Sequence, residues 1–197
     1  MAYQYGQGQG YQQPQGYNNP PARPPPPNPN QPNLSQIFQA VDKDRSGFIN
    51  AQELQSALSN GTHIPFNEET IKLMISMFDS SRSGQINFEN FQRLWAYINQ
   101  WQQTFRGFDR DNSGFVDQNE LAQAFQQFGY RFSQDFIGLL MRKFNRHNGK
   151  MAFDDFIQCC VAVQSLTSTF ASKDSQRKGQ ITVGFEEFLS MIFSVRT

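Results

Sequence analysis

Two 12-residue stretches of the chain carry acidic or small polar side chains at every second position, a glycine in the middle and a glutamate at the end. They are DKDRSGFINAQE at residues 42–53 and DRDNSGFVDQNE at residues 109–120. Calcium prefers about six to eight oxygen ligands, and a 12-residue loop supplies them from positions 1, 3, 5, 7, 9 and 12 around a sharp turn at a glycine. The predicted ligands are Asp42, Asp44, Ser46, Phe48, Asn50 and Glu53 in the first stretch, and Asp109, Asp111, Ser113, Phe115, Asp117 and Glu120 in the second.

Aspartate and serine are also common in turns and helix caps, which is the alternative interpretation of these stretches. Two complete matches, each between helical patterns, favour calcium binding over that alternative. The phenylalanine at position 7 of each stretch would act through its backbone carbonyl. The stretch at 109–120 offers four carboxylates and the stretch at 42–53 offers three, so charge alone predicts tighter calcium binding at 109–120.

Both stretches lie between segments in which apolar residues recur every third or fourth position, and this spacing predicts amphipathic helices. The helix–loop–helix pattern occurs five times, around the glycines Gly47, Gly84, Gly114, Gly149 and Gly179. Successive glycines are 30 residues apart in two places, so residues 88–107 and 153–172 are each expected to form one long helix shared by two hands. We therefore predict an all-α fold of five EF-hands and about eight helices.

The other three loops depart from the calcium-binding pattern; they span residues 79–90, 145–155 and 174–187. The second loop ends in Asn90 and so lacks the bidentate carboxylate. The fourth loop is one residue short and begins with Asn145. The fifth loop has Gln176 and Lys178 at ligand positions, and its carboxylates come too late. We expect weak or no calcium binding at these three loops.

Loops of this kind pair through the residue at position 8, which is aliphatic in all five: Ile49, Ile86, Val116, Met151 and Ile181. Hands one and two are expected to pair, as are hands three and four. The fifth hand has no partner within the chain, and a two-fold dimer with a second fifth hand would complete it. The apolar C-terminal segment FEEFLSMIFSV suits such an interface. The alternative is that the last helices pack on their own chain.

The composition limits the class of protein. Basic and acidic residues number 17 each, so nothing points to nucleic acid. No apolar run approaches the ~18 residues of a membrane-spanning helix, and the N-terminus does not have the pattern of a secretory signal. Cys159 and Cys160 fall in an apolar helical pattern, where packing is a better interpretation than catalysis or a disulfide. We expect a reduced, intracellular protein that is not an enzyme.

Residues 1–33 hold nine of the ten prolines, many Gln, Gly and Tyr residues, and Arg23 as their one charged residue. Such a segment buries too little apolar area to offset its ordering entropy, so we predict a disordered tail. Its PPARPPPP stretch at residues 20–27 favours polyproline II. The tail is either inert or a ligand for proline-binding partners, which include the folded part of this chain.

Five hands with alternating long and short spacing, a tail rich in Gln, Gly, Pro and Tyr, and a fifth loop lengthened by two residues resemble the penta-EF-hand family. The stretches VDKDRSGFI, FDRDNSG, FDDFIQ and LSMIFS carry the resemblance, which covers residues 34–197. It implies calcium at the first and third hands, which makes two sites per chain. It also implies dimerisation through the fifth hand, either with a second copy or with a related penta-EF-hand protein.

The resemblance further implies a calcium-dependent adaptor. In that family, calcium bares a hydrophobic pocket that takes proline-rich segments of membrane-trafficking and membrane-remodelling proteins. The positions that match the pocket are Trp101, Phe128, Tyr130, Arg131 and Phe185. A cytoplasmic location is implied, with calcium-dependent peripheral recruitment to endoplasmic reticulum exit sites, endosomes or other membranes.

A calcium sensor requires that closure on the ion moves a helix. Glu120 begins a helix that is expected to run to Phe128, so the corner QQFGYR at residues 126–131 should move, with Arg131 as its gate. The alternatives are a calcium buffer or constitutive scaffold, which would barely open on binding, and a regulatory subunit of a separate enzyme.

Overall fold

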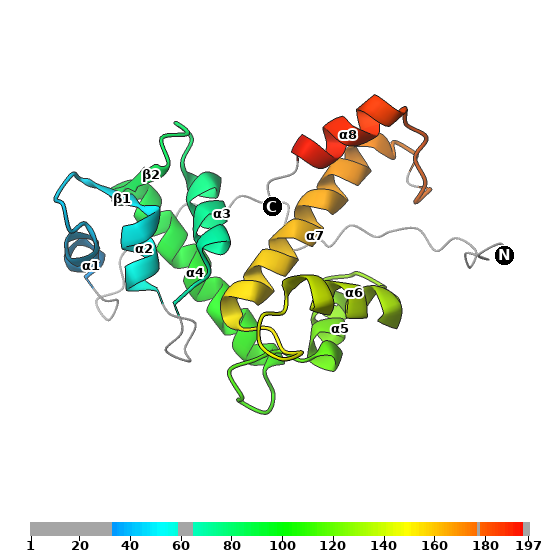
Figure 1. Ribbon diagram of the computed structural model, residues 1–197, viewed down its shortest axis with the longest axis horizontal. Helices are drawn as coiled ribbons and strands as arrows, with labels where there is room; N and C mark the ends of the chain where they lie inside the picture. The colour runs from blue at the N-terminus through cyan, green and yellow to red at the C-terminus, as the bar shows by residue number, and fades with distance from the viewer. Residues whose placement is uncertain (1–32, 59–64, 177, 195–197) are drawn as a thin grey trace.

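The computed structural model describes residues 33–58, 65–176 and 178–194. These residues form eight helices and one two-stranded antiparallel sheet (Figure 1). In chain order the elements are α1 (Leu34–Val41), β1 (Phe48–Asn50), α2 (Ala51–Ala57), α3 (Glu68–Phe78), β2 (Gln85–Asn87), α4 (Phe88–Phe108), α5 (Gln118–Gln127), α6 (Gln134–Phe144), α7 (Phe153–Lys173) and α8 (Phe185–Ser194). The predicted fold class is confirmed, whereas the predicted tail lies outside the described residues except for Asn33.

The loops of neighbouring hands are joined at position 8, as predicted. In the first two hands β1 and β2 pair with Ile49 opposite Ile86, and both side chains are buried. In hands three and four, Val116 and Met151 exchange two backbone hydrogen bonds of 2.8 Å. Ile181 of the fifth loop belongs to no strand of the described structure.

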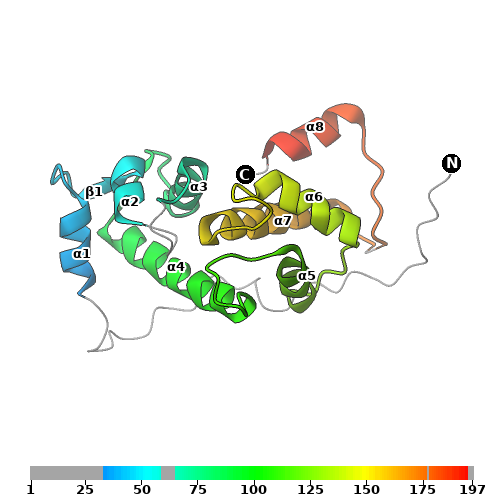
Figure 2. The ribbon, with the colours of Figure 1, turned by 60° about the horizontal axis from the view of Figure 1, so that its bottom comes forward.

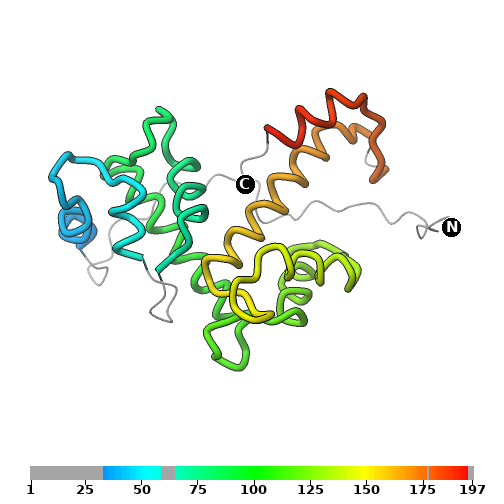
Figure 3. The backbone as a smooth tube through the Cα atoms, in the orientation of Figure 1, coloured from blue at the N-terminus to red at the C-terminus, as the bar shows by residue number. Residues whose placement is uncertain are grey.

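The two long helices predicted to be shared between hands are confirmed. Helices α4 and α7 have 21 residues each, and each runs without a break from one loop into the next (Figure 3). Asp109 is the C-cap of α4 and also the first residue of loop three. The end of the helix therefore sets the position of the first acidic side chain in that loop.

Helices α4 and α7 lie against each other (Figure 2). The core contains a cluster of aromatic rings where they meet. Phe105 makes edge contacts with Phe153 and Phe156 at ring-centroid distances of 5.4 and 5.5 Å, and Trp101 meets Phe156 at 5.9 Å. Edge-to-face ring pairs add to the stabilisation that comes from burial. Phe153 also meets Phe66, in the segment before α3, at 5.7 Å, and through this contact the cluster joins the first pair of hands to the second.

Cys159 and Cys160 lie on α7 as free, buried thiols. Burial raises the pKa of both thiols well above the usual range, so neither is ionised at neutral pH. An inert packing role fits this environment, since the thiolate is the reactive form of cysteine.

Helix α8 presents an apolar face to solvent. None of its ten residues is buried, and all ten are described. The exposed fraction is 77% for Phe185 and 83% for Phe193, and Phe188 and Ile192 are also exposed. An exposed aromatic surface of this kind marks an interaction site in many proteins. No helix in the described ranges is long and apolar enough to cross a membrane.

Candidate calcium-binding sites

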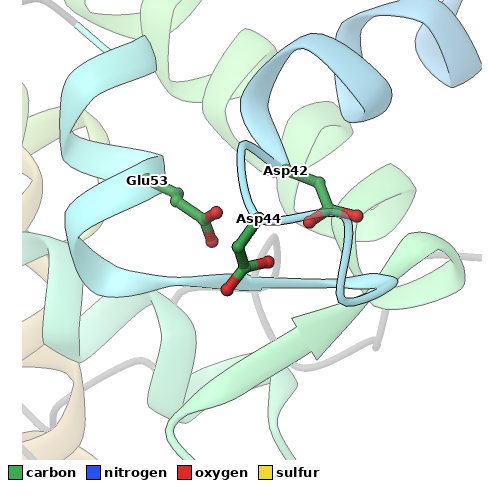
Figure 4. Close-up of side chains that lie close together, drawn as sticks. All are labelled: Asp42, Asp44 and Glu53. Atoms are coloured by element: carbon green, nitrogen blue, oxygen red, sulfur yellow. The ribbon is translucent and has the colours of Figure 1, made fainter.

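Three carboxylates converge in loop one. Asp42 and Asp44 come from the loop and Glu53 from the first turn of α2, and each offers an oxygen within 4.8 Å of the others (Figure 4). Asp42 and Glu53 are buried, whereas Asp44 is exposed. Several ionised oxygens around one point form the environment that calcium prefers.

Backbone N–H groups hold loop one in this arrangement. The Asp42 carboxylate accepts hydrogen bonds from the amides of Ser46 at 3.0 Å and Gly47 at 2.9 Å. The Glu53 carboxylate accepts from the amides of Lys43 at 2.9 Å and Asn50 at 3.0 Å. These bonds place the first and last acidic residues of the loop before any ion is bound.

Loop three repeats the same geometry. Asp109, Asp111 and Glu120 form the second group of three carboxylates within 4.8 Å. Asp109 accepts from the Gly114 amide at 2.9 Å, and Glu120 accepts from the amides of Arg110 and Asp117 at 3.0 Å each. The oxygen donors of both loops fit calcium in type and number.

Positions 9 and 12 also begin the following helix, which explains why the loops fold locally. Asn50 and Asp117 are the N-caps of α2 and α5, and each forms a capping box with the glutamate three residues later. A capping box satisfies two free N–H groups at once. The same side chains therefore start the helix and stand ready as ligands.

The acidic residue at position 3 is ionised in both loops. The pKa of Asp44 lies below its usual range, first because the Ser46 side chain donates a hydrogen bond to it and then because the Ser46 amide does. Ser113 acts in the same way on the pKa of Asp111. A carboxylate that is already deprotonated releases no proton when a cation binds.

The second and fifth loops keep the turn but not the ligands. Asp79 accepts from the Gly84 amide at 2.7 Å, and Asp174 accepts from the Gly179 amide at 2.6 Å. In the described part of the chain, groups of three metal-binding side chains occur in loops one and three, and neither of these two loops forms one.

In loop four, basic side chains of the loop lie close to the acidic residue at its end. Asp155, at its last position, is completely buried. Arg146 Nε lies 3.5 Å from Asp155 Oδ1, and His147 Nε2 lies 3.9 Å from Asp155 Oδ2. Arg146 also pairs with Glu69 of α3 at 3.1 Å. The sequence showed that this loop is short, but not that its own basic residues face Asp155.

The predicted pocket residues do not all lie together. Trp101 is buried, and its ring meets Phe128 at 6.3 Å. Phe125 contacts both Phe128 and Tyr130, so these aromatic residues form one cluster. Arg131 follows Tyr130 and is exposed. Phe185 lies elsewhere, at the start of α8 beside the far end of α7 (Figure 1).

A groove that the sequence did not reveal lies between α6, the second half of α7 and the segment before α6. Its volume is about 910 Å³, and its walls are largely apolar. The aromatic and aliphatic residues that line it include Tyr130, Phe132, Leu139, Phe144, Leu166 and Phe170. Of the five predicted pocket residues, Tyr130 is the one that lines this groove.

Paired helix–loop–helix units with converging carboxylates define the chain as an EF-hand calcium-binding protein. The family model described as an EF-hand domain pair matches residues 32–96, and the EF-hand domain model matches residues 100–129.

Sequence similarity to known proteins identifies the family. Sorcin of Schistosoma japonicum is 47% identical over 162 residues, which cover 82% of this chain and 95% of that protein. Human sorcin is 39% identical over 194 residues, 96% of each chain. Peflin of Danio rerio is 41% identical over 161 residues, 81% of this chain and 60% of that protein. The chain thus spans less than two thirds of that peflin and nearly all of the two sorcins.

A solved structure supports the same assignment. The homologue of programmed cell death 6 protein from Leishmania major Friedlin superposes with a TM-score of 0.72 at 36% sequence identity. The match covers 82% of this chain and 92% of that one. The chain belongs to the penta-EF-hand family of calcium-binding proteins, and the relatives named here, sorcin and peflin, are not enzymes.

Proposed function

We propose that the protein is a calcium sensor that binds calcium at loops one and three and then exposes apolar surface to a partner. The observation that carries this proposal is the convergence of three carboxylates in each of these loops. Calcium, when bound, would supply the positive charge that balances these carboxylates. Loops two, four and five would act as structural partners without ions.

Loop three is the connection between calcium and the aromatic cluster. Glu120 lies in the first turn of α5, and the helix ends at its C-cap Phe128. The Phe128 ring contacts Trp101 at 6.3 Å and Phe108 at 5.7 Å. A shift of α5 that follows Glu120 would therefore change how Phe128 packs on α4. We infer that the corner at residues 126–131 opens in this way, with the exposed Arg131 as its gate.

The partner surface that we propose is the groove next to this corner, which would take proline-rich segments. Proline-rich peptides adopt polyproline II and dock into grooves lined by aromatic residues. Tyr130 connects the two features, since it lines the groove and also contacts Phe125 of the cluster. Recruitment from the cytoplasm to membranes would then follow from the partner that is bound.

Binding of an apolar fluorescent dye distinguishes a calcium sensor from a calcium buffer. We expect dye fluorescence to rise several-fold when calcium is added to the full chain, because a sensor exposes additional apolar surface when it binds calcium. A proline-rich peptide should compete with the dye in calcium and not in chelator. Dye binding that is equal with and without calcium would support a buffer or scaffold. Co-purification of a catalytic chain would support a regulatory subunit.

We also propose that two chains associate through the fifth hand, because α8 leaves its aromatic residues exposed. Phe193→Ala removes a ring that is 83% exposed. If α8 is the interface, dimer dissociation should become easier by about tenfold, since part of a phenylalanine's burial energy is lost. Sedimentation at several protein concentrations measures this. Leu139→Ala, at a 49% exposed residue of α6, is the control and should leave association unchanged. Equal association of all three proteins would contradict the proposal.

A further inference from the structure

Lys150 of loop four lies against an acidic residue of loop three. Its ammonium nitrogen is 3.8 Å from Asp111 Oδ2, and both side chains are about half exposed. Asp111 occupies position 3 and belongs to the group of three converging carboxylates. A positive charge of the chain itself therefore stands beside the second calcium site.

The backbone holds Lys150 in this place. Its amide donates a 3.0 Å hydrogen bond to the carbonyl of His147, inside loop four. The next residue, Met151, exchanges two hydrogen bonds of 2.8 Å with Val116 of loop three. The α-carbon of Lys150 is thus fixed relative to loop three, and the ammonium group moves only as far as the side chain allows.

Loop one has no such charge at the matching position. Gln85 precedes Ile86 in loop two, as Lys150 precedes Met151 in loop four, and Gln85 pairs with Asn50 in the sheet. Glutamine is neutral at every pH. The two predicted calcium sites therefore differ in what the neighbouring loop presents to them.

We propose that Lys150 is a built-in cation that lowers the calcium affinity of loop three. The inference rests on the proposed calcium binding at this loop. Loop three has one carboxylate more than loop one, and the lysine offsets the charge of that extra carboxylate. A calcium ion entering loop three meets repulsion from the ammonium, and Asp111 must be shared between the two cations.

The charge has a second consequence in the metal-free protein. While no calcium is bound, the Lys150 ammonium lies 3.8 Å from Asp111 Oδ2 and attracts that carboxylate. The lysine thus stabilises the loop while no calcium is bound. Lys150 therefore stabilises the calcium-free state of loop three and also repels the ion. Both effects raise the calcium concentration at which loop three fills.

The test compares the wild type with Lys150→Gln by following two backbone amides in a calcium titration by NMR. Gly114 reports on loop three and Gly47 on loop one, because each donates a 2.9 Å hydrogen bond to the first aspartate of its loop. Calcium binding to loop three should tighten about three- to tenfold, as expected for removing one charge that lies beside a ligand of a divalent ion. The calcium-binding constant of loop one, followed through the Gly47 amide, should stay the same.

Three controls separate charge from structure. Lys150→Arg keeps the charge and should keep the wild-type affinity. Lys143→Gln removes a charge from α6, where the lysine lies over the Phe144 ring, and should not change loop three. The gain in Lys150→Gln should shrink in high salt, because salt screens exposed charges. Thermal unfolding in chelator should be similar for all four proteins, with at most a slight loss in Lys150→Gln, because a half-exposed ion pair adds little to stability.

Each result has a definite meaning. If Gly114 does not respond to calcium in the wild type, the proposed function fails at loop three. If Gly114 responds but its binding constant is unchanged in Lys150→Gln, the proposed role of Lys150 is overturned. It is also overturned if Lys143→Gln gives the same gain. Weaker binding together with a lower unfolding temperature would show that Lys150 is structural.

Discussion

Replacing Glu120 with glutamine is expected to weaken calcium binding at loop three by about 100-fold, or ~2.7 kcal/mol. Glutamine keeps the length of the side chain but has one neutral oxygen in place of a charged, two-oxygen ligand. The side chain would still reach the amide of Asp117, which now donates to Glu120 at 3.0 Å. The change is therefore directed at the ion and not at the start of α5.

The measurement is a calorimetric titration of calcium into the metal-free chain. The wild type should take up two ions per chain in the micromolar range, and Glu120→Gln should take up one. Glu53→Gln is the matched variant, because it makes the same change in loop one and should spare loop three. Glu89→Gln, at an exposed glutamate that pairs with Arg93 outside both sites, should bind as the wild type does. Two tight sites in Glu120→Gln would contradict the ligand assignment.

Glu120→Gln also connects binding to the switch. Loss of the loop-three ion should abolish the calcium-dependent rise in dye fluorescence, since α5 links Glu120 to the Phe128 contacts. Glu53→Gln should retain most of the rise, because loop one lies in the other pair of hands. A full dye response in Glu120→Gln would mean that the aromatic corner does not report on loop three.

Local patterns in the sequence were enough to predict the hands and the shared helices. A ligand loop is read from residues within 12 positions, and a helix from a repeat of three or four, so neither requires knowledge of distant contacts. The same reasoning applies to the capping boxes, in which Asn50 and Glu53 are three residues apart. Each of these features depends on neighbours in the chain.

The features that the sequence did not reveal are contacts between distant segments. Lys150 meets Asp111 across two paired loops, and Arg146 meets Glu69 although 77 residues separate them. The groove forms from α6, the segment before it and α7, and no local sequence pattern marks the faces that line it. A single sequence shows the apolar periodicity of each helix. It does not show which helix faces lie next to each other, so these sites become visible only in the three-dimensional structure.

The buried polar contacts between the two halves illustrate the same point. The backbone amide of Asn67, at the start of α3, donates a 2.8 Å hydrogen bond to the Asp154 carboxylate of α7. Asp155, the next residue, is also buried but less well satisfied, since its Oδ2 accepts no hydrogen bond from the described residues. The two neighbouring carboxylates therefore differ in how well their burial is compensated. The ionised form of Asp155 should lower the stability of the fold.

Asp155→Asn is expected to stabilise the protein at pH 7.5 by about 2 kcal/mol. Burial, and next the charge of Asp154, raise the pKa of Asp155 to about 6 from a usual value of 3.8. At pH 7.5 the folded chain must therefore keep an ionised carboxylate in a site that favours the neutral form. Asparagine is neutral and similar in shape, its oxygen can still accept from Asn67, and Arg146 retains Glu69 as a partner.

The sign of the pH dependence makes this prediction specific. Between pH 4 and 6 the folded state binds more protons at Asp155 than the unfolded state does, so this group stabilises the fold as the pH falls from 6 to 4. The advantage of Asp155→Asn should thus be largest above pH 7 and disappear near pH 4. Denaturant unfolding in chelator at several pH values measures the difference. Asp154→Asn removes only the contribution of the Asp154 charge to the raised pKa of Asp155, and it alters the acid bonded to the Asn67 backbone amide, so its gain should be clearly smaller. A loss of stability in Asp155→Asn at pH 7.5 would show that the contacts of the carboxylate with Arg146 and His147 outweigh the penalty of its burial.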